Sequence, residues 1–180
     1  MTSVITYNSP EYREMLALRY KILREPLGLH FSDEDLQREK DDVFIACREN
    51  GKIIGCCILT RLSDEALKLR QMAVDNPWQE KGVGTQIVRF AEQYAVEHGY
   101  SSIKLHARKT AVKFYEKCGY EISGDEFLEI GIPHFLMYKT SLSPVPSPKE
   151  RGDRLYNGLP LNSTPLSPKE RGLGREAHNS

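Results

Sequence analysis

The stretch LRQMAVDNPWQEKGVGTQIV, from Leu69 to Val88, decides the fold of this chain. It begins as a strand, passes through a turn, and continues from Val83 with apolar residues at helical spacing. Gly82 and Gly84 stand at the start of that helix, where bare backbone leaves N–H groups open to a ligand. The helix dipole and Lys81 add positive charge at the same point. The stretch therefore predicts an anion site or, as the alternative, an ordinary flexible turn.

Two common phosphate-binding patterns do not fit this glycine loop. A P-loop requires Gly-Lys-Ser/Thr after its spacer, and GVGT, from Gly82 to Thr85, has no lysine in that place. A dinucleotide-binding fingerprint requires a third glycine where this chain has Ile87. Any anion held here is therefore bound by another kind of loop.

The first 140 residues alternate between strand and helix patterns. Strand patterns occur at residues 3–7, 42–62 (a hairpin around Asn50-Gly51), 65–74, 101–107 and 134–139. Helix patterns occur at residues 10–25, 83–98 and 109–118, with one short helix in the loop 26–40. This order predicts an α/β (α+β) domain with a mixed, mostly antiparallel, twisted sheet of six to seven strands and about four flanking helices.

Composition disfavours several classes of function. The formal net charge is +0, so no basic field indicates nucleic acid or anionic lipid. No apolar run approaches the length of a membrane span, and the N-terminus lacks a signal-peptide pattern. Cys56 and Cys57 are adjacent in a strand and so point to opposite faces. The four cysteines show no metal-ligand spacing and are interpreted as reduced core thiols of a cytoplasmic protein: Cys47, Cys56, Cys57 and Cys118.

The composition changes near residue 140. Proline becomes frequent, and the sequence SPKERG occurs at residues 147–152 and again at 167–172. Apolar residues are sparse and show no periodicity, so this segment cannot bury enough surface to offset its ordering entropy. We expect residues 1–140 to form the domain and residues 141–180 to form a Pro/Ser-rich disordered tail with a tandem SPKERG repeat.

The segment from Leu69 to Val88 resembles the acyl-CoA-binding motif of the GNAT superfamily of N-acetyltransferases. That motif opens a helix with Q/R-x-x-G-x-G/A after a strand, and Gln79, Gly82 and Gly84 occupy its defining positions. The segment Gly131 to Met137, GIPHFLM, is similar to a stretch in one branch of small bacterial GNAT proteins.

A second motif follows in the expected order. HARKTAVKFYEKCGY, residues 106–120, resembles the next GNAT motif, in which an alanine is followed by a tyrosine and then K-x-G-[FY]. Ala111, Tyr115 and Gly119 fit this pattern. The family often has asparagine where this chain has Arg108, a side chain that can still act as a hydrogen-bond donor to pantetheine.

The resemblance implies acetyl-CoA as co-substrate and no metal. Backbone N–H groups of the glycine loop would hold the pyrophosphate, and the strand ending at Val74 would pair with the amides of the pantetheine arm. The residues implied in cofactor binding are Met72, Ala73, Val74, Gln79, Glu80, Lys81, Gly82, Val83, Gly84, Thr85 and Arg108.

Acetyl transfer needs a proton donor for the thiolate and a base for the amine. The resemblance makes Tyr115 the candidate acid and places the oxyanion donor near Val74, although Tyr115 also fits a packing role. No cysteine nucleophile is implied. The base stays open: a water chain without a single base is one alternative, and the side chains considered are Glu126, Glu129 and His134, with His106 either at the site or in the core.

The predicted function is transfer of an acetyl group from acetyl-CoA to a primary amine by direct attack in a ternary complex. The alternative is a non-catalytic acyl-CoA-binding sensor or interaction module on the same fold. The predicted partner is a small-molecule or peptide amine substrate, and neither nucleic acid nor a membrane is expected as a partner. The oligomeric state is left open, with a homodimer as one alternative. The acidic residues Asp33, Glu34 and Asp35 are interpreted as a solvated helix start.

Removal of the residues after Thr140 tests the predicted boundary. Because the tail buries little apolar surface, the shortened chain should melt within about 2 °C of the full chain in a thermal unfolding experiment. A drop of about 8 °C or more would mean that the domain extends further.

Overall fold

A mixed sheet carries the fold. The computed structural model describes residues 1–142, and the predicted tail lies outside them except for its first two residues. The sheet has seven strands in the order β1-β2-β3-β4-β5-β7-β6 within this part of the chain. The strands are β1 (Thr2–Ile5), β2 (Val43–Glu49), β3 (Lys52–Arg61), β4 (Ala66–Val74), β5 (Ser102–Arg108), β6 (Glu121–Glu129) and β7 (Ile132–Lys139).

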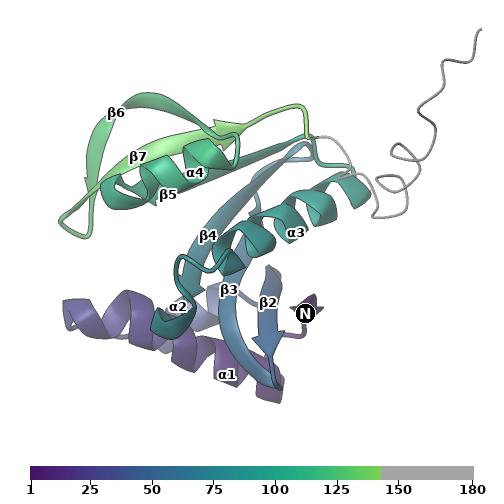
Figure 1. Cartoon of the computed structure of the whole chain (residues 1–180), viewed down its shortest axis with the longest axis vertical. Helices are drawn as coiled ribbons and strands as arrows, with labels where there is room; N and C mark the ends of the chain where they lie inside the picture. The colour runs from purple at the N-terminus through teal and green to yellow at the C-terminus, as the bar shows by residue number, and fades with distance from the viewer. Residues whose placement is uncertain (143–180) are drawn as a thin grey trace, which may run out of the picture. The chain divides into compact units, whose positions relative to one another are not determined.

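Helices cover both faces of the sheet (Figure 1). Only β4 and β5 pair in parallel; the other neighbouring strands of the described sheet are antiparallel. This confirms the predicted fold class. No helix within residues 1–142 is long and apolar enough to cross a membrane. The α-helices are α1 (Pro10–Arg19), α2 (Asp33–Arg38), α3 (Val83–Glu97) and α4 (Val112–Lys117).

Local signals in the sequence fix several element ends. The Ser9 hydroxyl accepts a hydrogen bond from the Tyr12 N–H at 3.1 Å and caps α1. Asn50 and Gly51 both have positive φ, +50° and +79°, as a two-residue hairpin turn requires. After α3, Gly99 has φ +82°, and the N–H of Tyr100 bonds back to the carbonyl of Ala95 at 2.8 Å.

The first helix differs from its prediction. The sequence pattern predicts one α-helix over residues 10–25, but α-helical bonding ends at Arg19 and a π-helical turn, Tyr20–Arg24, follows. A short 3₁₀ segment, Glu25–Leu27, then contains Pro26. Proline lacks an N–H and its ring clashes with the carbonyl four residues before it, so an α-helix cannot continue to this point. The π-turn sets the direction in which Arg24 leaves the backbone.

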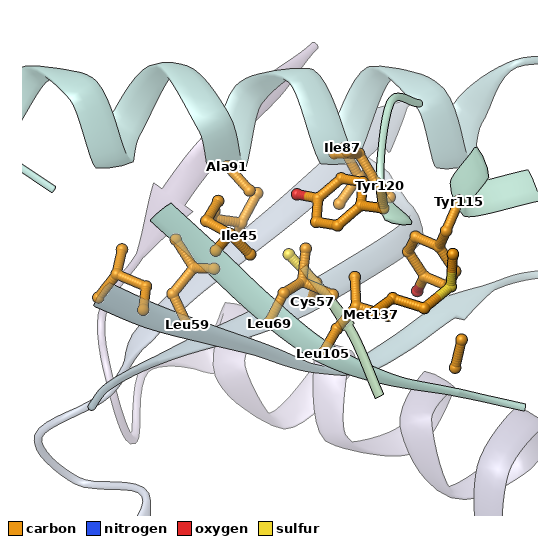
Figure 2. Close-up of a cluster of buried hydrophobic side chains, with 14 of the residues drawn as sticks. Ile45, Cys57, Leu59, Leu69, Ile87, Ala91, Leu105, Tyr115, Tyr120 and Met137 are labelled. Atoms are coloured by element: carbon orange, nitrogen blue, oxygen red, sulfur yellow. The ribbon is translucent and has the colours of Figure 1, made fainter. Parts of the chain in front are cut away.

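Two hydrophobic clusters lie on opposite faces of the sheet. One contains Cys57 with Ile87 of α3 and Leu105 of β5, as Figure 2 shows. The other contains Cys56 with Met15 of α1. The adjacent cysteines therefore point to opposite faces as predicted, and all four cysteines are free. Since each buried aliphatic side chain contributes about 1.5–3 kcal/mol, these clusters hold α1 and α3 against the sheet.

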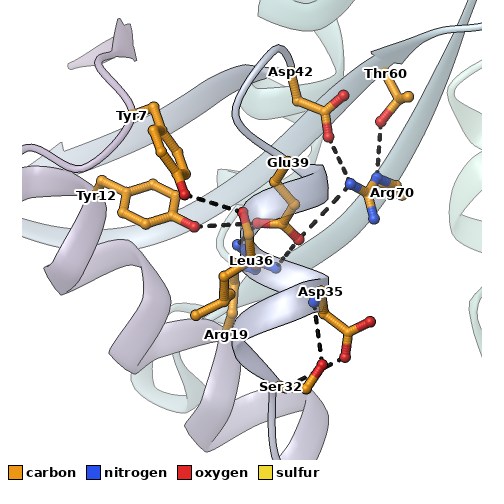
Figure 3. A network of polar contacts seen from close by, with 10 residues as sticks. All are labelled: Tyr7, Tyr12, Arg19, Ser32, Asp35, Leu36, Glu39, Asp42, Thr60 and Arg70. Atoms are coloured by element: carbon orange, nitrogen blue, oxygen red, sulfur yellow. Dashed lines mark hydrogen bonds and ion pairs between the residues drawn. The ribbon is translucent and has the colours of Figure 1, made fainter.

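A buried ion pair joins α1 to the segment after α2 (Figure 3). Arg19 and Glu39 are 0% and 2% exposed, and the guanidinium binds both carboxylate oxygens at 2.6 and 2.9 Å. The Tyr12 hydroxyl donates to Glu39 at 3.3 Å, and Arg70 of β4 lies 3.7 Å from the same carboxylate. Burial, followed by the charge of Glu39, raises the pKa of Tyr12 to about 12. The network ties α1, α2 and β4 together.

The described chain ends in contact with the domain. The N–H of Leu142 donates to the carbonyl of Ser101 at 3.3 Å, and its side chain packs against the α3 cluster. A chain that ends at Leu142 is therefore the matched control for one that ends at Thr140.

Substitution of Glu39 by glutamine should destabilise the fold strongly. The change keeps the shape of the side chain but leaves the buried guanidinium of Arg19 without its counter-charge. We expect a loss of about 3–5 kcal/mol in the free energy of unfolding, measured with urea. Glu34→Gln is the control, because that carboxylate is 85% exposed and should change nothing measurable. Equal stability of the two variants would contradict this account of the ion pair.

Candidate functional site

The parallel strands β4 and β5 separate part of the way along the sheet. They pair only from Ala66 opposite Ser102 to Leu69 opposite Leu105, although β4 continues to Val74. The cause lies in β4. Its register with β3 shifts, so that Gln71 and Met72 together oppose a single residue of β3. This is a β-bulge, with Gln71 at φ +53°, and it bends β4 away from β5.

A cavity of about 1050 Å³ occupies the opening between the two strands. It is lined from the α3 face by Gly82, Gly84 and Phe114, and from the α1 face by Ile22 and Leu23. Because these two groups belong to opposite faces of the sheet, the cavity passes through the sheet where the strands diverge. Two ligands that enter from opposite faces can therefore meet in it.

The glycine loop forms one end of the cavity. Gly82 precedes the first residue of α3 with φ +82°, and no side chain caps this helix. The first helical bond runs from the N–H of Gln86 to the carbonyl of Gly82 at 3.0 Å, so the N–H groups of residues 83–85 have no intrahelical acceptor. An added Cβ at Gly82 would meet no atom within 4 Å. The helix N-terminus is thus open to an anion.

Gly84 has a second role that the sequence does not reveal. An added Cβ there would lie 3.1 Å from the ring of Phe114 and 3.5 Å from the terminal methyl of Met72. The glycine therefore lets α3 approach α4 and β4 closely, in addition to leaving backbone bare.

The backbone at the end of β4 faces the cavity. The N–H of Asp75 donates to Ile54 of β3 at 2.9 Å, so by alternation the groups of Val74 face away from β3. The carbonyl of Val74 accepts a hydrogen bond from the side-chain amide of Gln79 at 3.0 Å. Gln79 thereby fixes the turn between β4 and α3.

Most of the predicted cofactor residues line the cavity, and three do not. Those that line the cavity are Met72, Val74, Gln79, Glu80, Gly82, Gly84, Thr85 and Arg108. Ala73 and Val83 are buried in the two hydrophobic clusters, so only their backbone can face a ligand. The ammonium of Lys81 lies 5.4 Å from the ring centre of Trp78, outside the cavity lining.

Tyr115 lies between the core and the cavity. It is 6% exposed, packs in the α3 cluster (Figure 2) and also lines the cavity. Burial raises the pKa of this phenol, and the nearby thiols of Cys57 and Cys118 add smaller contributions. The hydroxyl therefore stays protonated and is available as a hydrogen-bond donor.

Two histidines and one carboxylate gather at the other end of the cavity. Nδ1 of His106 lies 3.1 Å from Glu129, and Nε2 of His134 lies 3.9 Å from the same carboxylate oxygen. Nδ1 of His134 lies 2.8 Å from the carbonyl of Ile132, which can only accept, so this nitrogen carries the hydrogen. In the neutral ring Nε2 is then free to accept a proton. The structure thus brings the predicted His134 and Glu129 together and adds His106 at the site.

Other predicted residues lie apart from this cluster. Glu126, the third candidate base, lies 2.7 Å from the ammonium of Lys109 and does not line the cavity. Asp33, Glu34 and Asp35 form the first turn of α2, which Ser32 caps, as expected for a solvated helix start. Several cavity-lining residues were not singled out by the sequence patterns, among them Arg24 and Gln71.

Comparison with known proteins decides the family. Residues 26–141 match the family model described as an acetyltransferase (GNAT) domain. The chain belongs to the GNAT acetyltransferase family. This confirms the resemblance found in the sequence and makes the chain an acyl-CoA-dependent N-acetyltransferase by family.

The chain is similar to two proteins of Bacillus subtilis and to a solved acetyltransferase structure. The uncharacterized N-acetyltransferase YjcF of Bacillus subtilis is 30% identical over 140 residues, which are 77% of this chain and 99% of that protein. The uncharacterized protein YyaT of Bacillus subtilis is 42% identical over 79 residues, 44% of this chain and about half (53%) of that protein. A GNAT family acetyltransferase from Elizabethkingia anophelis with acetyl-CoA bound is 18% identical, with a TM-score of 0.61 over 78% of this chain and 97% of that one. This last likeness shows the GNAT fold.

Substitution of Gly84 by valine should weaken coenzyme A binding. The branched side chain would take up space in the cavity that Gly84 lines, beside the open N–H groups of the first turn of α3. It would also push Phe114 and Met72. Loss of one hydrogen bond to a charged group corresponds to about 10- to 100-fold in dissociation constant, measured by calorimetry.

The double variant Gly84→Val/Phe114→Leu separates the two roles of the glycine. The smaller residue at position 114 relieves the packing against α4, so the melting temperature should recover while the affinity stays low. Recovery of both would mean that Gly84 serves packing alone.

Proposed function

We propose that this GNAT protein transfers an acetyl group from acetyl-CoA to a primary amine by direct attack in a ternary complex. The observation that carries the proposal is the cavity through the sheet. It joins the glycine loop on one face to His106, Glu129 and His134 on the other. The structural relative from Elizabethkingia anophelis, which has acetyl-CoA bound, supports the choice of co-substrate.

The cofactor half of the site follows from the open backbone groups. The pyrophosphate would bind the free N–H groups of residues 83–85, where the helix dipole favours negative charge. The pantetheine arm would lie along β4 and bond the outward-facing backbone of Met72 and Val74, as an added strand does. The thioester oxygen would then lie near the N–H of Val74, which can stabilise the oxyanion.

His134 is the base of this proposal. Its Nε2 faces the cavity end where Glu129 lies, and the bond from Nδ1 to Ile132 fixes the tautomer that leaves Nε2 free. Glu129 attracts the ammonium form of the substrate and stabilises the imidazolium that forms when the proton moves. His106 holds Glu129 in place through its bond at 3.1 Å.

The reaction forms one C–N bond and breaks one C–S bond. The neutral amine attacks the thioester carbonyl, the tetrahedral intermediate collapses, and the sulfur leaves with the electron pair. Tyr115 donates a hydrogen bond to that sulfur and passes its proton as the negative charge builds. The nitrogen of the intermediate releases one proton, which reaches the phenolate through water, so the products are the amide and free coenzyme A. Because burial raises the pKa of this phenol, the phenolate takes up that proton readily.

The setting of the reaction is also proposed. A cytoplasmic location, action without nucleic acid or membrane, and assembly into a homodimer remain predictions from the sequence and the family resemblance. Membership of the small bacterial branch, which rests on the segment Gly131 to Met137, also remains a prediction.

Tyr115→Phe should lower kcat by about 100-fold or more, since general acid catalysis typically contributes that much. Coenzyme A binding should be unchanged, because the ring remains in place. Tyr120→Phe is the matched control: its ring centre lies 5.8 Å from that of Tyr115, it is equally buried, and it does not line the cavity. The assay follows free thiol release.

Three outcomes are informative. A fall specific to position 115 supports the acid role. Equal kcat in both variants would show that Tyr115 only packs. Binding of acyl-CoA without thiol release in the wild-type chain, with any amine offered, would favour the non-catalytic sensor instead.

A further inference from the structure

The lining of the cavity has an excess of positive charge. Among residues 1–142, two carboxylates line the cavity, Glu80 and Glu129, and the second is held by His106. The cations that line it are Arg24, Lys68, Arg70, Arg108 and Lys117. Arg70 is neutralised by Asp42, whose carboxylate lies 2.6 Å away. The other cations of the cavity lining have no carboxylate within 4.0 Å among residues 1–142.

Arg24 is placed at the cavity by the π-helical turn. Its guanidinium lies 4.9 Å from the ring centre of Phe31, and its Nε is buried without a hydrogen-bond partner. The carboxylates that act on it from a distance, Asp35 and Glu39, already bind Ser32 and Arg19. Desolvation lowers the pKa of Arg24, and the positive charge of Arg19 and then that of Arg108 contribute in the same direction.

Arg108, the last residue of β5, lines the same cavity. By strand alternation it lies on the same face of β5 as His106, and its neighbour across the sheet is His134. Two partly buried guanidinium groups thus line one cavity, and neither has a carboxylate of residues 1–142 within 4.0 Å. Guanidinium groups bind carboxylates through paired hydrogen bonds, which a lysine ammonium cannot do.

Several apolar side chains also line the cavity. Ile22, Leu23 and Leu27 line it from the α1 side, and Ile130 of the β6–β7 turn and Ile132 of β7 line it as well. Such a surface favours an apolar body next to the charged groups.

Building on the proposed amine acetylation, we propose that the acceptor is a free amino acid with an apolar side chain. Its carboxylate binds Arg24 and Arg108, its amine faces His134 and Glu129, and its side chain lies against the apolar residues of the lining. Arg108 therefore acts on the acceptor rather than on pantetheine.

The test compares amino acids with the amines that lack only the carboxylate. Leucine is paired with 3-methylbutylamine and phenylalanine with 2-phenylethylamine, and free thiol and the N-acetyl product are both measured. We expect kcat/KM for each acid to exceed that of its partner by at least about tenfold. In Arg24→Gln and in Arg108→Gln this ratio should fall about 10- to 100-fold, while Arg24→Lys keeps part of it.

Arg38→Gln is the matched control, because that side chain is 75% exposed on α2 and does not line the cavity. It should leave the ratio unchanged, and thermal unfolding confirms that each variant is folded. Coenzyme A affinity is measured by calorimetry in all variants. Acid and amine used equally well, or a ratio that the arginine variants do not change, would overturn the proposal while amine acetylation stands.

Two further results also decide the matter. Weaker coenzyme A binding in the arginine variants, with an unchanged ratio, would assign both arginines to the cofactor and overturn the proposal. The absence of thiol release with every acid and amine would overturn the proposed acetylation itself and this inference with it.

Discussion

The separation of β4 from β5 is the constraint on which the rest of the structure depends. A parallel pair of strands in the middle of a sheet normally leaves no room for a ligand, because its backbone groups bond each other along the whole length. Here the bulge at Gln71 and Met72 ends that pairing after Leu69 and Leu105. The backbone of the last residues of β4 is freed, and a passage opens through the sheet. The positive φ of Gln71 costs about 1–3 kcal/mol, which the packing on both faces must offset.

Both faces of the sheet are needed to hold this opening. On one face α3 packs closely on β3, where an added Cβ at Gly55 would lie 2.7 Å from Ile87. On the other face the pair of Arg19 and Glu39 fixes α1 and the π-turn that carries Arg24. A buried ion pair is weak evidence for net stability, but it specifies one geometry, since either partner alone would be an uncompensated charge. The polar network therefore determines where the amine end of the cavity lies.

The sequence predicted those features that depend on short-range signals. The turn at Asn50-Gly51, the cap at Ser9 and the stop at Gly99 each depend on the conformational preference of one or two residues. The opposite faces of Cys56 and Cys57 follow from strand alternation alone. The glycine loop and Tyr115 were found because their spacing resembles a family motif, and the family model confirms that resemblance.

What the sequence could not predict depends on contacts between distant segments. The bulge at Gln71 has no glycine to mark it, because its conformation is imposed by the register of β3. The meeting of His106 with Glu129 requires β5 and the β6–β7 hairpin to be neighbours, across 23 residues of chain. The sequence pattern places Arg24 in a predicted α-helix, where nothing distinguishes it from other cations. The π-turn, which the pattern does not predict, directs this side chain to the cavity. The formal net charge of +0 likewise gives no sign of the excess of positive charge in the cavity lining. That excess arises because carboxylates such as Glu39 and Asp42 form ion pairs with other arginines. The chemistry of the acceptor end is therefore set by which charges the fold leaves unpaired.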